Sequence, residues 1–245
     1  MMNNSFSKNE CANNSVNSDA KLRCAPLGAG YAGRYRLQGE IVAQYFQQLQ
    51  IEMPQIKAYV SRYPRDAFFI QEVLRFHSVA GTIEQSFKNI GTNIDERIMS
   101  HILVRSLIEN YFKLLYIYDD HTKSQARFDE CVNGFKIQYA KLYNDNWLPN
   151  KNQLEPADPT WRSLSSPLDL NSMIATLMNI HGNRLSYLYF VYRISSFDTH
   201  GNSLEALFNA SFNKTPCSFP VLKLEQVTEL IANQYLVIWN NGNIP

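Results

Sequence analysis

The chain has 245 residues, a length typical of one domain with a full hydrophobic core, and it carries 23 Lys and Arg against 22 Asp and Glu. This balance excludes the strong positive field that draws proteins to long nucleic acids or anionic membranes, so we expect any RNA contact to be local. The four cysteines lack C-x-x-C spacing and a neighbouring histidine cluster, which argues against a zinc site and a disulfide framework.

The amino terminus has no basic start followed by an apolar run, so it does not predict a signal peptide. No later segment reaches the length needed to span a bilayer. We therefore expect a cytoplasmic protein with reduced thiols and no membrane contact.

Residues 1–33 are rich in Asn, Ser and Gly, with few large apolar groups to offset the entropy of ordering. They predict a flexible polar tail, followed by a helical bundle domain over residues 34–245. In that domain apolar residues recur at helical spacing and alternating strand patterns are absent, which predicts an all-α fold of about seven helices.

The first two expected helices are separated by a turn marked by proline, and their apolar stripes include Leu49 and Val73. A third helix is predicted over residues 95–120, with apolar residues on almost every side, which indicates a central position. The fourth carries a stripe of Phe128, Val132, Phe135, Tyr139 and Leu142.

Four prolines, at positions 149, 156, 159 and 167, predict a long loop from Trp147 to Pro167. The next helix is expected to open at Ser166, with Pro167 as its first helical residue, and to end at residues 181–183. Another is expected from about Asn183 to the stop at Gly201. A short helix at residues 203–212 and a final amphipathic helix at about residues 224–238 complete the bundle.

Arg105 and Glu109 lie at i and i+4 on the third expected helix. Because the helix is expected to be central and the pair partly buried, the two residues are expected to bond each other and a polar partner on a neighbouring helix, the face that carries Arg193 and His200. An ordinary ion pair on a half-exposed helix is an equally good interpretation, and it needs no functional role.

Arg193 and His200 lie seven residues apart, so about 700° of helical rotation brings both side chains onto one face. A guanidinium that binds phosphate beside an imidazole that exchanges protons is suited to RNA cleavage. The structural alternative is that His200 only caps the helix's negative end. Since R-x4-6-H has roughly 0.7 chance matches in a chain of this composition, only the placement of the pair favours a functional site.

Three segments carry a resemblance: RSLIENYF, PLDLNSMIATLMNIHG and YLYFVYRISSFDTHGNSLEALF. Together, within a core region at residues 95–210, they resemble a bacterial domain-of-unknown-function family with R-x3-E on an early helix and Y-x3-S-x3-H at the end of a later one. The matching residues are Arg105, Glu109, Tyr192, Ser196 and His200.

The chain is also similar to the HEPN superfamily of all-helical proteins, in which R-x4-6-H serves metal-independent RNA cleavage in toxins and phage defence. By this resemblance Arg193 and His200 are the catalytic pair, and two copies face each other in a homodimer. Supporting roles fall to the surrounding motif and polar residues: Arg105, Glu109, Tyr192, Ser196, Asp198 and Asn202.

Other chemistry has little support in the sequence. The remaining histidines form no i,i+4 pair and no H-E-x-x-H motif, and no P-loop or G-x-G-x-x-G follows a predicted strand. We therefore expect neither a metal nor a cofactor. The fourteen Tyr and fourteen Phe are expected to fill helix-packing seams rather than to stack on bases.

Two functional hypotheses follow. The first is a HEPN-like endoribonuclease, a toxin or phage-defence effector, that acts by 2′-hydroxyl attack on RNA. The second is a non-catalytic helical module, a sensor or antitoxin-like protein with a protein partner in a defence system, in which the same residues form a structural polar network.

Overall fold

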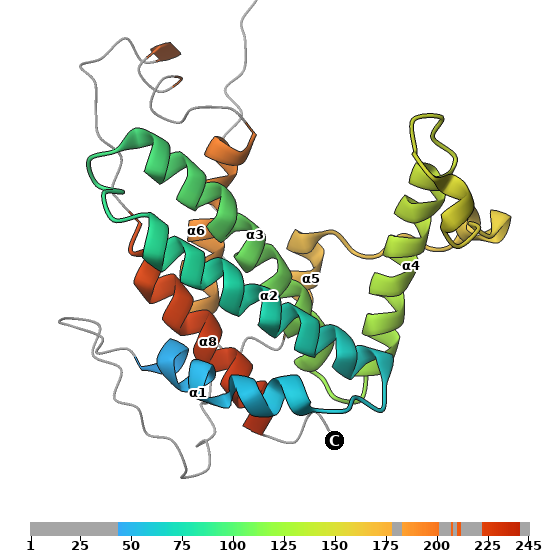
Figure 1. Cartoon of the computed structure of the whole chain (residues 1–245), viewed down its shortest axis with the longest axis horizontal. Coiled ribbons are helices and arrows are strands. Elements are labelled where there is room, and N and C mark those ends of the chain that lie inside the picture. Colours follow the sequence, from blue (N-terminus) through green and yellow to red (C-terminus); the bar gives the residue numbers. More distant parts are fainter. Residues whose placement is uncertain (1–43, 178–182, 201–206, 208–209, 212–221, 241–245) are drawn as a thin grey trace, which may run out of the picture. The chain divides into compact units, whose positions relative to one another are not determined.

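The computed structural model describes residues 44–177, 183–200, 207, 210–211 and 222–240, all of which belong to one compact unit. Within these ranges the chain forms seven α-helices and two short 3-10 helices, and no strand is present. The all-α prediction is therefore confirmed (Figure 1). None of the helices in these ranges is long and apolar enough to cross a membrane.

The α-helices are α1 (Tyr45–Ala58), α2 (Pro64–Ser86), α3 (Ile94–Tyr118), α4 (Ser124–Tyr143), α5 (Leu170–Thr176), α6 (Asn183–Thr199) and α8 (Leu224–Asn240). The 3-10 helices η1 (Lys151–Gln153) and η2 (Pro159–Ser163) lie in the segment predicted as a long loop. The short helix expected at residues 203–212 falls mostly on residues outside those that the structure describes.

Helix α3 occupies the centre of the bundle and contacts α2, α4, α5, α6 and α8. Asn93 starts it as an N-cap, because its side-chain oxygen accepts hydrogen bonds from the backbone N–H groups of Asp95 and Glu96. Apolar residues then surround the helix, as its sequence predicted. Those that are buried include Val104, Leu107, Ile108, Tyr111, Phe112, Leu114, Leu115 and Ile117.

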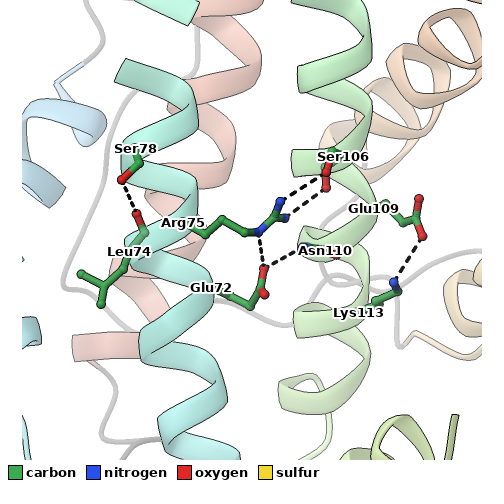
Figure 2. Close-up of polar contacts among 8 residues, drawn as sticks. All are labelled: Glu72, Leu74, Arg75, Ser78, Ser106, Glu109, Asn110 and Lys113. Carbon is green, nitrogen blue, oxygen red and sulfur yellow. Dashed lines mark hydrogen bonds and ion pairs between the residues drawn. The ribbon is translucent and has the colours of Figure 1, made fainter. Parts of the chain in front are cut away.

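A polar seam joins α2 to α3 (Figure 2). Arg75 donates to Glu72 at 3.1 Å and to the hydroxyl and carbonyl oxygens of Ser106 at 3.2 and 3.3 Å. Asn110 donates to the same Glu72 carboxylate at 2.7 Å. Because each guanidinium nitrogen has a partner, Arg75 fixes the relative position of the two helices.

Helix α1 is fixed at its start by a residue from the far end of the chain. The Glu229 carboxylate of α8 accepts the backbone N–H groups of Tyr45 and Phe46 at 2.8 and 3.1 Å. The first N–H groups of a helix have no partner within that helix, so the Glu229 carboxylate caps α1 from a distant part of the chain. Pro54 lies inside α1, and the turn before α2 follows it at residues 59–63.

The start predicted for α5 was wrong. The helix begins at Leu170, with Asp169 as its N-cap accepting from the Ser172 N–H, and it ends at Thr176. Pro167 lies outside the helix instead of opening it, and its ring packs against Gly134 of α4. The proline is therefore used for tertiary packing, which no local pattern indicates.

The predicted apolar stripe of α4 is only half correct. Phe128 is buried, but Phe135 is 67% exposed and Leu142 is 54% exposed. In the described part of the chain, α4 makes its largest contacts with α3 and η2, and its second half lies beside the 3-10 segment rather than in the bundle core (Figure 1). The expectation that this stripe fills a helix-packing seam was wrong beyond Val132.

Two helical glycines provide a matched test of this packing. A Cβ at Gly134 would lie 2.6 Å from Cγ of Pro167, whereas nothing lies within 4 Å of a Cβ at Gly81 of α2. We expect Gly81→Ala to raise the free energy of unfolding by about 1 kcal/mol, the helix-propensity gain. The same change at Gly134 should lower it by about 1 kcal/mol or more, because overpacking outweighs that gain.

Chemical denaturation of both variants measures these free energies. Equal stabilisation by the two substitutions would contradict the packing of Pro167 on α4.

Candidate functional site

Helix α6 has a buried side and an exposed side. Its buried residues face α3 and the core: Leu185, Leu188, Val191, Ser195 and Asp198. Five residues on the opposite side are exposed, and we call them the outer flank: Ser186, Phe190, Arg193, Phe197 and His200. Their spacing of three and four residues makes the outer flank one continuous stripe along the helix.

Arg193 and His200 both lie on the outer flank. The His200 N–H donates to the Ser196 carbonyl at 3.1 Å, so the helical hydrogen bonding extends one residue beyond the helix end at Thr199. Among the described residues neither side chain has a hydrogen-bond or ion-pair partner. Both side chains are exposed to solvent.

Arg105 of α3 joins two of the motif residues of α6. Its Nε donates to the Ser196 hydroxyl at 3.0 Å, and its Nη2 donates to the Tyr192 hydroxyl at 3.3 Å. The Ser196 hydroxyl in turn donates to the Tyr192 carbonyl at 2.7 Å, and the guanidinium carbon lies 5.1 Å from the Tyr192 ring centroid. Arg105 thus fixes α6 against α3 by hydrogen bonds and a cation–π contact.

Glu109 has a different partner from the one expected. It forms an ion pair with Lys113 at 3.2 Å, one turn further along α3 (Figure 2). No ion pair between Glu109 and Arg105 occurs among the described residues. The expected mutual bond was wrong, because the Arg105 side chain extends across to α6, where a hydroxyl pair and a ring face are available.

Two aromatic side chains, Tyr189 and Phe112, pack against the Tyr192 ring. The Tyr189 and Tyr192 rings are stacked with centroids 6.3 Å apart, and Phe112 meets Tyr192 edge-on at the same distance. The Tyr189 hydroxyl donates to Asn171 of α5 at 3.0 Å. The Tyr192 ring is therefore held from two sides, and its hydroxyl is directed toward Arg105.

Sequence reasoning missed one member of the α3–α6 interface. His101 lies buried one turn before Arg105, and its Nδ1 is 2.6 Å from a carboxylate oxygen of buried Asp198. Since the carboxylate accepts, Nδ1 carries the hydrogen of this contact. The spacing of Leu188, Val191 and Asp198 on one side of α6 is the signal that would have placed this carboxylate toward α3.

Burial lowers the pKa of His101 below its ordinary value. The hydrogen bond and charge of Asp198 act in the opposite direction, and Arg97 lowers the pKa further. Nε2 is buried and has no hydrogen-bond partner among the described residues. A proton on this nitrogen would have no acceptor, which gives a structural reason why the neutral form is favoured.

Two further candidate residues, Asp198 and Asn202, were predicted to lie near the Arg193 and His200 pair. Asp198 was expected to support Arg193 and His200 from nearby, but it faces the bundle interior and bonds His101. Asn202 lies outside the described residues. Within the described ranges no group of three His, Cys, Asp or Glu side chains is arranged to hold a metal ion.

The contact between Arg105 and Ser196 can be tested by a double-mutant cycle. We expect Arg105→Ala and Ser196→Ala to show a coupling free energy of about 1 kcal/mol, because each removes the same hydrogen bond. Urea unfolding of both single variants and the double variant measures it. The control is Ser163→Ala combined with Arg105→Ala, because the Ser163 hydroxyl donates to the Thr160 carbonyl and not to Arg105. If the losses in unfolding free energy for Arg105→Ala and Ser196→Ala are additive, the contact is contradicted.

The state of His101 predicts a pH dependence. Because its native pKa lies below the value near 6.5 of an unfolded chain, acid protonates the unfolded state first. The stability that His101 contributes is complete above about pH 6.5 and is lost as the pH falls below it. We expect the stability advantage of wild type over His101→Gln to shrink between pH 7.5 and pH 5.5, measured by urea unfolding. An advantage that grows in acid would mean that His101 is charged in the native protein.

Comparison of the chain with protein families, with curated proteins and with solved structures gave no match.

Proposed function

We propose that this protein is a HEPN-like, metal-independent endoribonuclease in which Arg193 and His200 form the catalytic pair. The observation that supports this proposal most directly is the position of both side chains on the outer flank of α6, seven residues apart and exposed. A phosphate that contacts the Arg193 guanidinium would thereby lie within the reach of a proton-exchanging group on the same helix face.

The proposed reaction is an internal transfer at one phosphate. His200 removes the proton of the ribose 2′-hydroxyl, and the 2′ oxygen forms a bond to the adjacent phosphorus. The bond from phosphorus to the 5′ oxygen breaks, and that oxygen takes up a proton from water. Arg193 stabilises the negative charge that develops on the phosphate oxygens, and the products are a 2′,3′-cyclic phosphate and a 5′-hydroxyl.

Arg105, Tyr192, Ser196 and Asp198 act as positioning residues in this proposal. Arg105 fixes the middle of α6 to α3, and the buried bond from Asp198 to His101 fixes the last turn. Helix ends otherwise fray, since their last carbonyl groups lack partners. Glu109 is not assigned a positioning role, because its ion-pair partner is Lys113 on the same helix.

A homodimer is part of the proposal. Phe190 and Phe197 are 50% and 44% exposed, and they alternate with Arg193 and His200 along the outer flank. In a twofold arrangement the same surface of each copy faces the other. The aromatic rings would then supply apolar contact, and the Arg193 and His200 side chains of both copies would line one shared cleft.

The exposed rings also favour a second candidate function. A stripe that alternates aromatic and charged residues resembles a protein-binding surface, in which large rings supply the apolar anchor. In this case the outer flank binds a different protein, within a toxin–antitoxin or phage-defence pair, and the protein cleaves no RNA. Arg193 and His200 then contribute to affinity rather than to catalysis.

The test is RNA cleavage by the purified full chain in the presence of chelator. We expect cyclic-phosphate products, and at least a hundredfold lower rate in both Arg193→Ala and His200→Ala, the scale of general acid–base catalysis. Exposed Arg62 and His121 lie in turns outside α6, so Arg62→Ala and His121→Ala serve as matched controls that retain activity.

Intact RNA with wild-type protein, or equal cleavage by all four variants, would contradict the ribonuclease proposal. The first of these results favours the protein-binding alternative.

A further inference from the structure

The distal half of α4 carries an aromatic surface that the proposed catalytic pair does not use. Phe135, Tyr139 and Tyr143 follow at i, i+4 and i+8, with successive ring centroids 5.9 and 6.0 Å apart and interplanar angles of 26° and 32°. Trp161 of η2 joins them, 6.0 Å from the Tyr139 ring. We call these four residues the α4 platform.

The platform remains open to solvent. Phe135 is 67% exposed, the other three rings are partly exposed, and none of the four belongs to the buried core. A side chain of the following turn, Trp147, is 92% exposed. So much exposed aromatic area in one region indicates a binding surface, because isolated exposed rings are common but groups of them are not.

The rings are held in place without a ligand. The Tyr139 hydroxyl donates to the Glu155 carbonyl at 2.5 Å, which ties α4 to the segment before η2. Asp158 caps η2 by accepting the Thr160 N–H at 2.8 Å. Because the stack is ordered beforehand, a ligand that binds to it avoids the entropy cost of arranging the rings.

Cationic groups lie directly on the platform. The Lys136 ammonium lies 5.7 Å from the Trp161 ring centroid, and the Lys151 ammonium lies 4.6 Å from that of Tyr143. Residues 135–162 also include the exposed cationic residues Lys141 and Arg162.

Three acidic residues lie in the same segment: Asp145, Glu155 and Asp158. Two of them are engaged locally, since Asp145 accepts the Trp147 N–H and Asp158 caps η2. The two ammonium groups that lie over the rings are positive, although Asp158 interacts electrostatically with Lys136 and the segment as a whole is nearly balanced.

We propose that the α4 platform binds single-stranded RNA. Unpaired bases stack on flat aromatic faces with little regard for sequence, and phosphates pair with nearby ammonium groups. A duplex does not offer its base faces, which selects for single strands. An apolar protein partner is a poorer match, because it would remove Lys136 and Lys151 from water without supplying an anion.

The choice of RNA as the ligand rests on the proposed function, since the platform would hold the strand that Arg193 and His200 cleave. Binding and cleavage are nevertheless separable. A 2′-O-methyl oligonucleotide lacks the 2′-hydroxyl nucleophile, so its binding to the full-length protein is measured without cleavage.

The experiment is fluorescence anisotropy with a short fluorescent 2′-O-methyl oligouridine at several salt concentrations. We expect Phe135→Ala to weaken binding about fivefold or more, the effect of losing one stacked base. Lys136→Ala and Lys151→Ala should each reduce the slope of log affinity against log salt by about 0.7. The matched controls are Tyr63→Ala and Lys88→Ala, at exposed positions near the ends of α2, and they should bind like wild type.

Three results would overturn the inference. They are no binding by wild type, binding that Phe135→Ala leaves unchanged, and self-association in light scattering that Phe135→Ala abolishes while RNA binding is unaffected. Thermal melting followed by circular dichroism checks that the variants fold. Platform-dependent binding without cleavage of ordinary RNA would refute the ribonuclease alone, whereas cleavage with platform-independent binding would refute the platform alone.

Discussion

The central position of α3 is the constraint on which the rest of the structure depends. Five other helices contact α3, so several of its polar side chains lie at interfaces and hydrogen-bond across them. His101 and Arg105 find theirs on α6, and Ser106 and Asn110 find theirs on α2. These bonds set the rotation of the neighbouring helices as well as their separation.

The rotation of α6 about its own axis determines which residues of the outer flank are exposed. Ser196 and Tyr192 are held toward Arg105 and Asp198 toward His101, so the opposite side of the helix faces solvent. Arg193 and His200 lie on that side together with two phenylalanines. One helix therefore carries bonded motif residues on the side that faces α3 and exposed residues on the side that faces solvent.

Helix α4 belongs to the bundle at one end only. Arg127 donates to the Tyr116 carbonyl at 2.7 Å and lies over the Tyr116 ring, so the first turns are anchored to α3. Beyond Val132 the partners of α4 are the 3-10 segment and Pro167, which leave the rings of the α4 platform partly exposed. One helix therefore contributes to core stability and also presents an aromatic surface with cations on it.

The sequence by itself determined the helical class and most helix positions, because the periodicity of apolar residues and the capping residues act locally. It also determined that Arg193 and His200 share a helix face, since seven residues make nearly two turns. Only the tertiary structure decided which side chains meet: Arg105 with Ser196 instead of Glu109, Asp198 with a histidine 97 residues away, and Pro167 with Gly134. It also decided that the α4 rings stay outside the core. Which side chains meet depends on how the helices rotate and pack against one another. That packing is determined by contacts between residues far apart in the chain, and the local periodicity of apolar residues carries no information about such contacts.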